Sequence, residues 1–192
     1  MVVRVETKID WTPKALDVLA AASELFYAHG IHAVGVEAIA ARAGVTKKTL
    51  YDRFGSKERL VTEYLAARDR RWRDLLTTRL EEAGPDARDR LRAVFTATAE
   101  WSRVEGRRGC AMVNAHPELE ESSPARAVIS DEKRWLLGLF HDIAARSGAP
   151  APQDLAPVLL LIHEGALVTH GLGVLDDVFP RALDAALAVL DR

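Results

Sequence analysis

Side chains that could hold phosphate groups and read base edges gather between residues 46 and 57. They are Thr46, Lys47, Lys48, Thr49, Tyr51 and Lys57. Lysine ammonium groups pair with phosphate oxygens, and lysine, hydroxyl and phenol groups also donate hydrogen bonds to phosphates or to base edges. This stretch therefore carries the kind of chemistry that nucleic-acid recognition requires.

Local signals place these side chains on a short helix that follows a turn. Gly44 can take the positive φ that ends one helix, and Thr46 can cap the next. That helix stops before Gly55, and Ser56 can cap a third helix with Glu58 in its first turn. A short basic helix after a turn is the arrangement with which a helix-turn-helix places one helix in a DNA major groove.

Simpler explanations exist for the same residues. Lys47 and Lys48, taken alone, could belong to an ordinary solvated helix face, and Tyr51 could be a partly buried aromatic residue of a small domain. The fixed spacing of the whole motif favours contact with DNA over both.

The residues offer little support for catalysis or metal binding. Cys110 is the single cysteine; it is most simply a small buried residue, since no second cysteine could resolve an oxidised thiol. His163 and His170 share a helix face, but no Cys, His or Asp cluster lies at ligand spacing. Glu164 beside His163 could suggest acid–base chemistry, yet no nucleophile or glycine-rich phosphate loop accompanies it. We expect no enzyme, no metal and no cofactor.

A second set of candidates could line a small-molecule pocket in the later part of the chain. Pockets are mostly apolar with a few polar groups that orient the ligand. The candidates are Trp72, Phe95, Thr98, Trp101, Asn114, His116, Trp135 and His163. Ordinary packing or surface exposure explains each of them equally well. The mostly apolar lining predicts a hydrophobic or aromatic ligand whose identity the sequence does not give.

Composition and periodicity predict an all-α protein. The chain has 192 residues, 48% of them apolar, and a net charge of −2, so its overall charge gives no sign of nucleic-acid binding. Apolar residues recur with helical spacing nearly throughout, and no strand pair is visible. The N-terminus lacks the apolar segment of a secretory signal, and the longest aliphatic run is too short to span a bilayer. We expect a cytoplasmic protein.

Helix signals divide the chain into two domains. A first helix, capped by Thr12 and ended by Gly30, should bury Leu16 and Phe26. A long helix begins at Ser56 and has no breaker before Gly84, a length of about 40 Å. We predict a helix-turn-helix domain over residues 1–56, with an arm over 1–11, and a helical ligand-binding and dimerisation domain over 57–192.

The C-terminal helices predict self-association. A helix capped by Asp154 and ended by Gly171 is apolar around most of its circumference, so it should be buried on more than one side. In a chain of this size we expect a partner subunit to cover the second side. A last helix, opened by Pro180, adds Leu183, Leu187 and Leu190 in line.

The N-terminal motif resembles the TetR family of bacterial transcriptional regulators. The matching positions cover about Trp11 to Leu65 and are Gly30, Val36, Ile39-Ala40, Ala43-Gly44-Val45-Thr46, Thr49-Leu50-Tyr51, Phe54, Ser56-Lys57-Glu58 and Leu60. Two positions depart from the pattern. Gly35 stands where the family usually caps a helix with Thr or Ser, and Lys48 stands where Gly is common. Lys48 would alter base or phosphate contacts, so another member's site preference does not carry over.

The resemblance implies a homodimer whose two N-terminal domains bind adjacent major grooves of a double-stranded DNA operator. Thr46, Lys47 and Lys48 would approach base edges, and Thr49, Tyr51 and Lys57 would hold phosphates. A small-molecule effector would enter the C-terminal core and release a repressor from an inverted repeat. Nothing in the residues fixes the sign of regulation, so an activator stays open. A different class also stays open: a helical ligand-binding or scaffold protein with a vestigial helix-turn-helix.

Overall fold

The computed structural model describes residues 9–191, and within that range it contains helices and no strand. Most of the predicted arm, residues 1–8, lies outside the described residues. The elements are α1 (Pro13–His29), α2 (Val36–Arg42), α3 (Lys47–Phe54), α4 (Lys57–Ala83), α5 (Ala87–Val104), α6 (Ala111–Ala115), η1 (His116–Glu118), α7 (Ala125–Arg146), α8 (Pro152–Leu172) and α9 (Val178–Leu190). The all-α fold class is confirmed.

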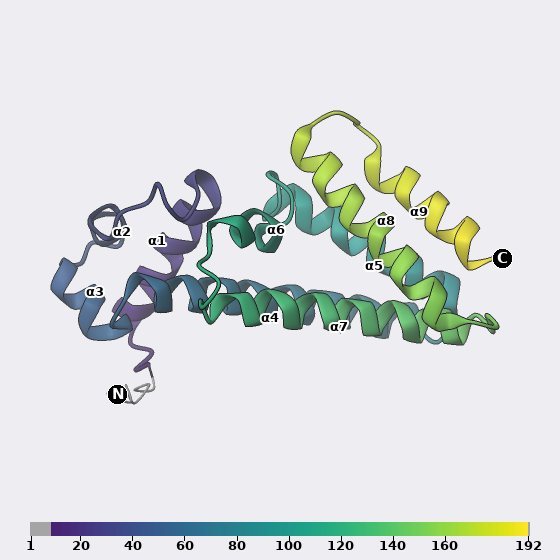
Figure 1. Cartoon of the computed structure of the whole chain (residues 1–192), viewed down its shortest axis with the longest axis horizontal. Coiled ribbons are helices and arrows are strands. Elements are labelled where there is room, and N and C mark those ends of the chain that lie inside the picture. Colours follow the sequence, from purple (N-terminus) through teal and green to yellow (C-terminus); the bar gives the residue numbers. More distant parts are fainter. Residues whose placement is uncertain (1–8, 192) are drawn as a thin grey trace.

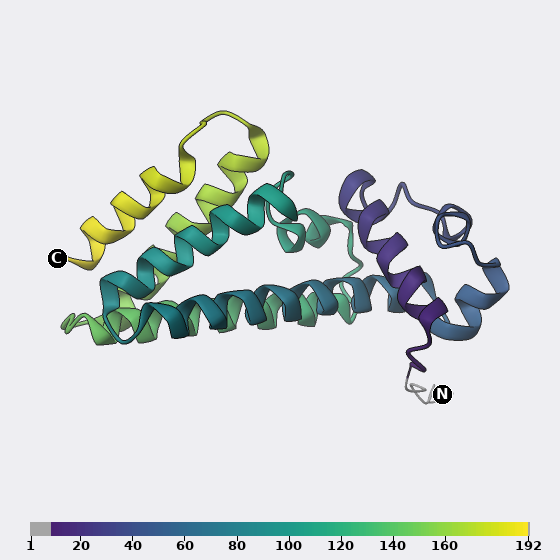
Figure 2. The same ribbon diagram turned by 180° about the vertical axis from the view of Figure 1, so that it is seen from behind.

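Two parts are joined by one long helix (Figure 1). Helices α1 to α3 form a head at one end, and α5 to α9 form a body at the other. Helix α4 leaves the head and runs the length of the body, with α7 packed against it (Figure 2). Helices α8 and α9 lie side by side in the body, where α8 packs against α7 and α9 packs against α5.

The predicted helix caps of the head are confirmed. The Thr12 hydroxyl accepts a hydrogen bond from the Ala15 N–H at 3.3 Å, and Thr46 accepts one from Thr49 at 3.1 Å. Ser56 accepts from the Arg59 N–H at 3.0 Å and so begins α4. Each cap satisfies one of the N–H groups that a helix leaves unpaired at its start. Three short-range signals therefore fix where α1, α3 and α4 begin.

Other sequence predictions were wrong. Leu16 is 53% exposed, because the buried face of α1 is turned toward Ala15, Val18 and Ala22. Helix α8 begins earlier than predicted, at Pro152, which puts Asp154 in its first turn and not at its cap. Proline suits a first turn because its missing N–H would have no partner there.

The ends of α8 and α9 also differ from the prediction. Helix α8 continues through Gly171 and ends at Gly173, which has a left-handed conformation. Helix α9 begins at Val178, two residues before Pro180, so the proline again lies in the first turn. Gly171 and Pro180, which were predicted to mark helix boundaries, therefore lie inside α8 and α9.

The head and the body have separate apolar cores, but the head's core reaches beyond residue 56. Leu60 and Leu65 of α4 belong to it, as do Met112 of α6 and Ile129 of α7. The head is therefore packed against the first turns of α4 and against the segment around α6. Residue 56 stays our proposed domain boundary, and the contact across it is extensive.

Among the described helices, α8 is long and apolar enough to cross a membrane by length and composition. In the structure it packs against α7 and α9, which explains part of its apolar circumference. The rest is an exposed stripe formed by Val158, Leu161, Gly165, Val168 and Leu172. These positions alternate in steps of three and four residues, the spacing of a helix seam that packs on another helix.

Candidate functional sites

Helix α3 presents a basic face to solvent because its two large apolar residues point inward. Leu50 and Phe54 are fully buried, and Phe54 packs edge-on against Trp11 with ring centroids 6.1 Å apart. The opposite side of the helix carries Lys48, whose side chain is 83% exposed, and Tyr51, which is also exposed. The structure thus brings the predicted recognition residues to one outer surface of the head.

The lysines on this surface are paired with neighbouring carboxylates. The Lys47 Nζ lies 2.5 Å from Glu37 Oε1, and the Lys48 Nζ lies 2.7 Å from Asp52 Oδ2. The hydrogen bond with Glu37 raises the pKa of Lys47. Exposed pairs of this kind contribute about 0–1 kcal/mol, so a phosphate can replace the carboxylate at little cost.

Thr46, Thr49 and Lys57 have structural roles in the free protein. The Thr46 hydroxyl caps α3 and lies 2.9 Å from the Thr49 hydroxyl. The Lys57 Nζ donates to the Ile31 carbonyl at 2.6 Å and lies 5.8 Å from the centroid of the Phe26 ring. Lys57 therefore ties the start of α4 to the turn after α1, and it is less free to meet a phosphate than Lys48.

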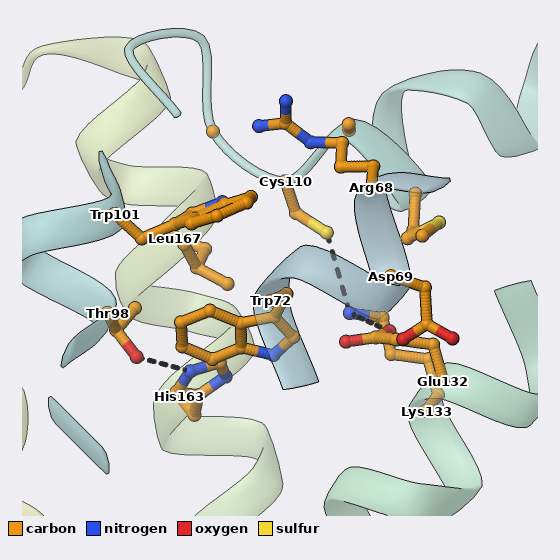
Figure 3. A pocket seen from close by; sticks show the side chains of 13 residues that line it. Arg68, Asp69, Trp72, Thr98, Trp101, Cys110, Glu132, Lys133, His163 and Leu167 are labelled. Atoms are coloured by element: carbon orange, nitrogen blue, oxygen red, sulfur yellow. Dashed lines mark hydrogen bonds and ion pairs between the residues drawn. The ribbon is translucent and has the colours of Figure 1, made fainter. Parts of the chain in front are cut away.

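A narrow cavity lies inside the body, between α4, α5, α7 and α8 (Figure 3). The space open to the centre of a water-sized molecule is about 40 Å³, which is room for roughly two or three waters. Four of the predicted ligand-binding residues line it: Trp72, Thr98, Trp101 and His163. Trp72 and Trp101 contact each other, with ring centroids 5.7 Å apart.

The other four candidates lie away from the cavity wall. Phe95 is buried behind His163, with ring centroids 5.9 Å apart, and Trp135 packs under the Arg73 guanidinium at 4.8 Å. Asn114 donates its side-chain N–H to the Arg108 carbonyl at 2.8 Å, and His116 is exposed beside Arg126. The structure therefore gathers four of the eight predicted ligand-binding residues around the cavity and places the other four away from its wall.

A chain of polar groups crosses the cavity. The Thr98 hydroxyl donates to the Val94 carbonyl at 2.7 Å and lies 2.9 Å from His163 Nε2. His163 Nδ1 lies 3.3 Å from Glu164 Oε1, and the same oxygen lies 2.9 Å from the Lys133 Nζ. Burial opposes ionisation of Glu164, but the hydrogen bond from His163 and the charge of Lys133 lower its pKa.

Sequence reasoning missed the charged groups of this cavity, including Arg68, Asp69, Glu132 and Lys133. The sequence pattern indicates two of them, Arg68 and Glu132. Arg68 falls four residues from both Tyr64 and Trp72 on the buried stripe of α4. Glu132 falls three residues after Ile129 and four before Leu136 on the buried stripe of α7. Charged residues are rarely found at buried helical positions, because the cost of removing the charge from water must be offset by a partner. Such a residue is therefore a candidate for a functional site.

Tyr27 of α1 connects the head to two walls of this cavity. Its hydroxyl accepts from the Arg108 N–H at 2.8 Å and donates to the Gly109 carbonyl at 2.9 Å. Its ring lies 4.6 Å from the Arg68 guanidinium, which lies 5.2 Å from the Trp101 ring on its other side. Gly109, Arg68 and Trp101 all line the cavity, so Tyr27 contacts two residues of the cavity lining, Gly109 and Arg68.

The loop between α5 and α6 also touches α8 directly through its backbone. A Cβ on Gly171 would lie 2.9 Å from the carbonyl carbon and oxygen of Arg108 and from the N of Gly109. Gly109 has a φ of +79°, and a Cβ there would lie 2.9 Å from the Leu167 carbonyl oxygen. Two glycines therefore allow the loop and α8 to approach closely. We call this contact of α1, the loop and α8 the junction.

Comparisons with known proteins agree with this architecture. Residues 18–64 match the family described as bacterial regulatory proteins, tetR family. The chain is 30% identical to a TetR-family transcriptional regulator of Streptomyces coelicolor, whose crystal structure superposes with a TM-score of 0.85 over 93% of this chain and 94% of that one. The chain belongs to the TetR family of transcriptional regulators, and its helix-turn-helix is a DNA-binding domain.

Other relatives match over less of their length or at lower identity. The HTH-type transcriptional activator FasR of Mycolicibacterium smegmatis is 45% identical over 83 residues, which are 42% of this chain and 36% of that protein. The chain thus matches about a third of the length of this curated relative. The reduced form of Escherichia coli NemR is 21% identical, with a TM-score of 0.78 over 91% of this chain and 95% of that one, which shows a shared fold.

Proposed function

We propose that this chain is a ligand-responsive regulator that binds an inverted-repeat operator as a homodimer in the cytoplasm. The observation that carries the proposal is the outer face of α3, where Lys47, Lys48 and Tyr51 lie together on the solvent side of a helix anchored by two buried residues. A helix of this kind is what a helix-turn-helix inserts into a major groove.

Each residue of the surface has a proposed role. Thr46, Lys47 and Lys48 approach base edges at the start of α3, while Thr49 and Tyr51 hold phosphates. Lys57 adds a phosphate contact at the start of α4 if its bond to the Ile31 carbonyl is exchanged. The carboxylates of Glu37 and Asp52 keep Lys47 and Lys48 paired in the free protein and give way to DNA.

The exposed stripe of α8 supports the homodimer. Leu161 and Leu172 are 72% and 70% exposed in the single chain, which is unfavourable for large apolar side chains that share one face. Gly165 lies between them and would let a partner helix approach closely. We place the same stripe of a second copy against it across a two-fold axis, with α9 beside it.

The cavity supports control by a small molecule. Because its free space is so small, a ligand larger than a few waters must push the walls apart. Two of those walls contact Tyr27 of the head, so the displacement changes how the head sits on the body. A typical coupling of about 1–3 kcal/mol between effector and DNA would give partial release.

Selection of binding sites from random duplex DNA tests the proposal. The purified chain should enrich an inverted repeat whose half-sites lie about one helical turn or more apart. Lys48→Gly should enrich a different repeat, with discrimination at the affected base pair changed by about 1–3 kcal/mol. Recovery of no common sequence by the unaltered protein would refute operator binding, and identical repeats would remove Lys48 from base reading.

The sign of regulation has two candidates. We propose repression, as the position-by-position resemblance implies. Activation is favoured by one observation, which is that the relative FasR is named an activator. A reporter gene behind the selected operator distinguishes them, because expression falls on adding a repressor and rises on adding an activator.

A further inference from the structure

The cavity has two chemically different ends (Figure 3). Thr98, His163 and Trp101 lie at one end, and Asp69, Glu132 and Lys133 lie at the other. The Trp72 indole lies between them, so an elongated ligand would pass its ring.

Most polar groups of the cavity already have partners inside the protein. Thr98 and His163 bond to each other, and Arg68 bonds to the carboxylate of Glu105. Asp69 Oδ1 lies 2.7 Å from the Arg73 Nε. A ligand gains little from these groups, because it would first have to break an existing contact.

Glu132 is the least satisfied of these groups, because its ion-pair partner is shared with a second carboxylate. The Lys133 Nζ lies 3.0 Å from Glu132 Oε2, but it also lies 2.9 Å from Glu164 Oε1 and 3.4 Å from Cys110 Sγ. One ammonium group is therefore shared between two carboxylates. The contact to Glu132 is an ion pair without hydrogen-bond geometry. Of the buried side-chain atoms in residues 9–191 that lack a hydrogen-bond partner, Glu132 Oε2 is the one on the cavity wall.

We propose that the effector is an amine, whose cationic N–H group bonds to Glu132 and whose apolar or aromatic body lies against Trp72 and Trp101. Glu132 is 4% exposed, so a donor that reaches it relieves a carboxylate that water cannot solvate well. The Trp72 ring, which lies between the two ends of the cavity, adds attraction for a nearby cation. This assignment rests on the proposed effector role of the cavity.

The same geometry excludes an acidic ligand. A ligand carboxylate would lie beside Glu132 and Asp69, and both cations on the wall, Arg68 and Lys133, already pair with carboxylates. Burial raises the pKa of Glu132; Lys133 opposes this rise, and the charges of Glu164 and Asp69 add to it. A second negative charge here would add to that repulsion, whereas a cation opposes it.

Three probes of similar size and different charge test the proposal: phenethylamine, phenethyl alcohol and phenylacetate. Their affinities for the full-length protein can be measured by calorimetry and by quenching of the wall tryptophans. We expect phenethylamine to bind at least about tenfold more tightly than the alcohol, because a charged hydrogen bond is gained, and phenylacetate to bind most weakly. Glu132→Gln should remove the preference for the amine. Asp131→Asn, at the exposed neighbouring position, should keep it.

The following results would refute the assignment of the ligand as an amine. Equal or tighter binding of the alcohol or of phenylacetate refutes it, as does absence of amine binding up to about 1 mM. An amine preference that survives Glu132→Gln also refutes the assignment. If that variant does not fold, the relative affinities of the three probes for the unaltered protein test the assignment. If phenylacetate binds and displaces DNA, the effector role stands and the amine assignment falls. If saturating amine leaves DNA affinity unchanged, the amine site stands and the effector role falls.

Discussion

Replacing Gly171 by alanine tests whether the junction sets the position of the DNA-binding head. The new methyl group would lie 2.9 Å from backbone atoms of Arg108 and Gly109, closer than real Cβ atoms approach other atoms. No flexible side chain can absorb the contact, so the loop or the end of α8 must move, and we expect the loop to move. Because that loop holds the Tyr27 hydroxyl through two hydrogen bonds, we expect α1 and the rest of the head to shift with it.

The magnitude follows from two opposing effects. Overpacking of this kind costs about 1–3 kcal/mol, while alanine is favoured over glycine inside a helix by up to about 1 kcal/mol. The net loss of unfolding free energy for Gly171→Ala is then about 0–3 kcal/mol. Gly138→Ala in α7 is the matched control, because no atom lies within 4 Å of its new Cβ. The control should gain up to about 1 kcal/mol, so the two variants should differ by about 1–3 kcal/mol.

Urea unfolding at one fixed protein concentration measures the stabilities, and fluorescence anisotropy with the selected operator measures DNA affinity. We expect Gly171→Ala to change DNA affinity and Gly138→Ala to leave it unaltered. If both variants bind DNA equally well while Gly171→Ala is less stable, the junction is structural only and does not couple to the head. If the two variants are also equally stable, the close contact itself is wrong.

Two further predictions concern assembly and affinity. Leu161→Glu places a charge in the α8 stripe and should yield a monomer by sedimentation. Val104→Glu, at a similarly exposed apolar position on α5, should stay a dimer. A dimeric Leu161→Glu would show that the interface lies elsewhere. Lys57→Ala should weaken binding to all DNA sequences alike and lower the slope of log affinity against log salt by about one unit per subunit; an unchanged slope would mean that Lys57 keeps its bond to Ile31 on DNA.

The parts that could be predicted from sequence are those fixed by contacts between near neighbours. Thr12, Thr46 and Ser56 cap their helices through N–H groups three residues ahead, so a short motif contains all the information. The same locality explains the errors in α8 and α9. Asp154, Gly171 and Pro180 each carry a boundary signal, but proline is also accepted in a first turn, and Gly171 is needed for contact with a distant loop.

The cavity could be predicted only in part, because it depends on contacts between helices that are far apart in the chain. Thr98 and His163 are separated by 65 residues and meet at 2.9 Å. Their types suggested a ligand contact, but no spacing rule shows that they face each other. Glu132 carried a usable signal, its place on a buried stripe, whereas Asn114 and His116 looked equally suitable and lie outside the wall.

The most direct test of the central claim compares two duplexes by fluorescence anisotropy at fixed salt. One carries the selected inverted repeat, and the other has both half-sites scrambled. We predict binding of two protomers to the intact repeat with an affinity at least about a thousandfold above that for the scrambled duplex, as specific DNA-binding proteins show. Equal affinity for both duplexes would show that α3 reads no sequence, and the account of this chain as an operator-binding regulator would be contradicted.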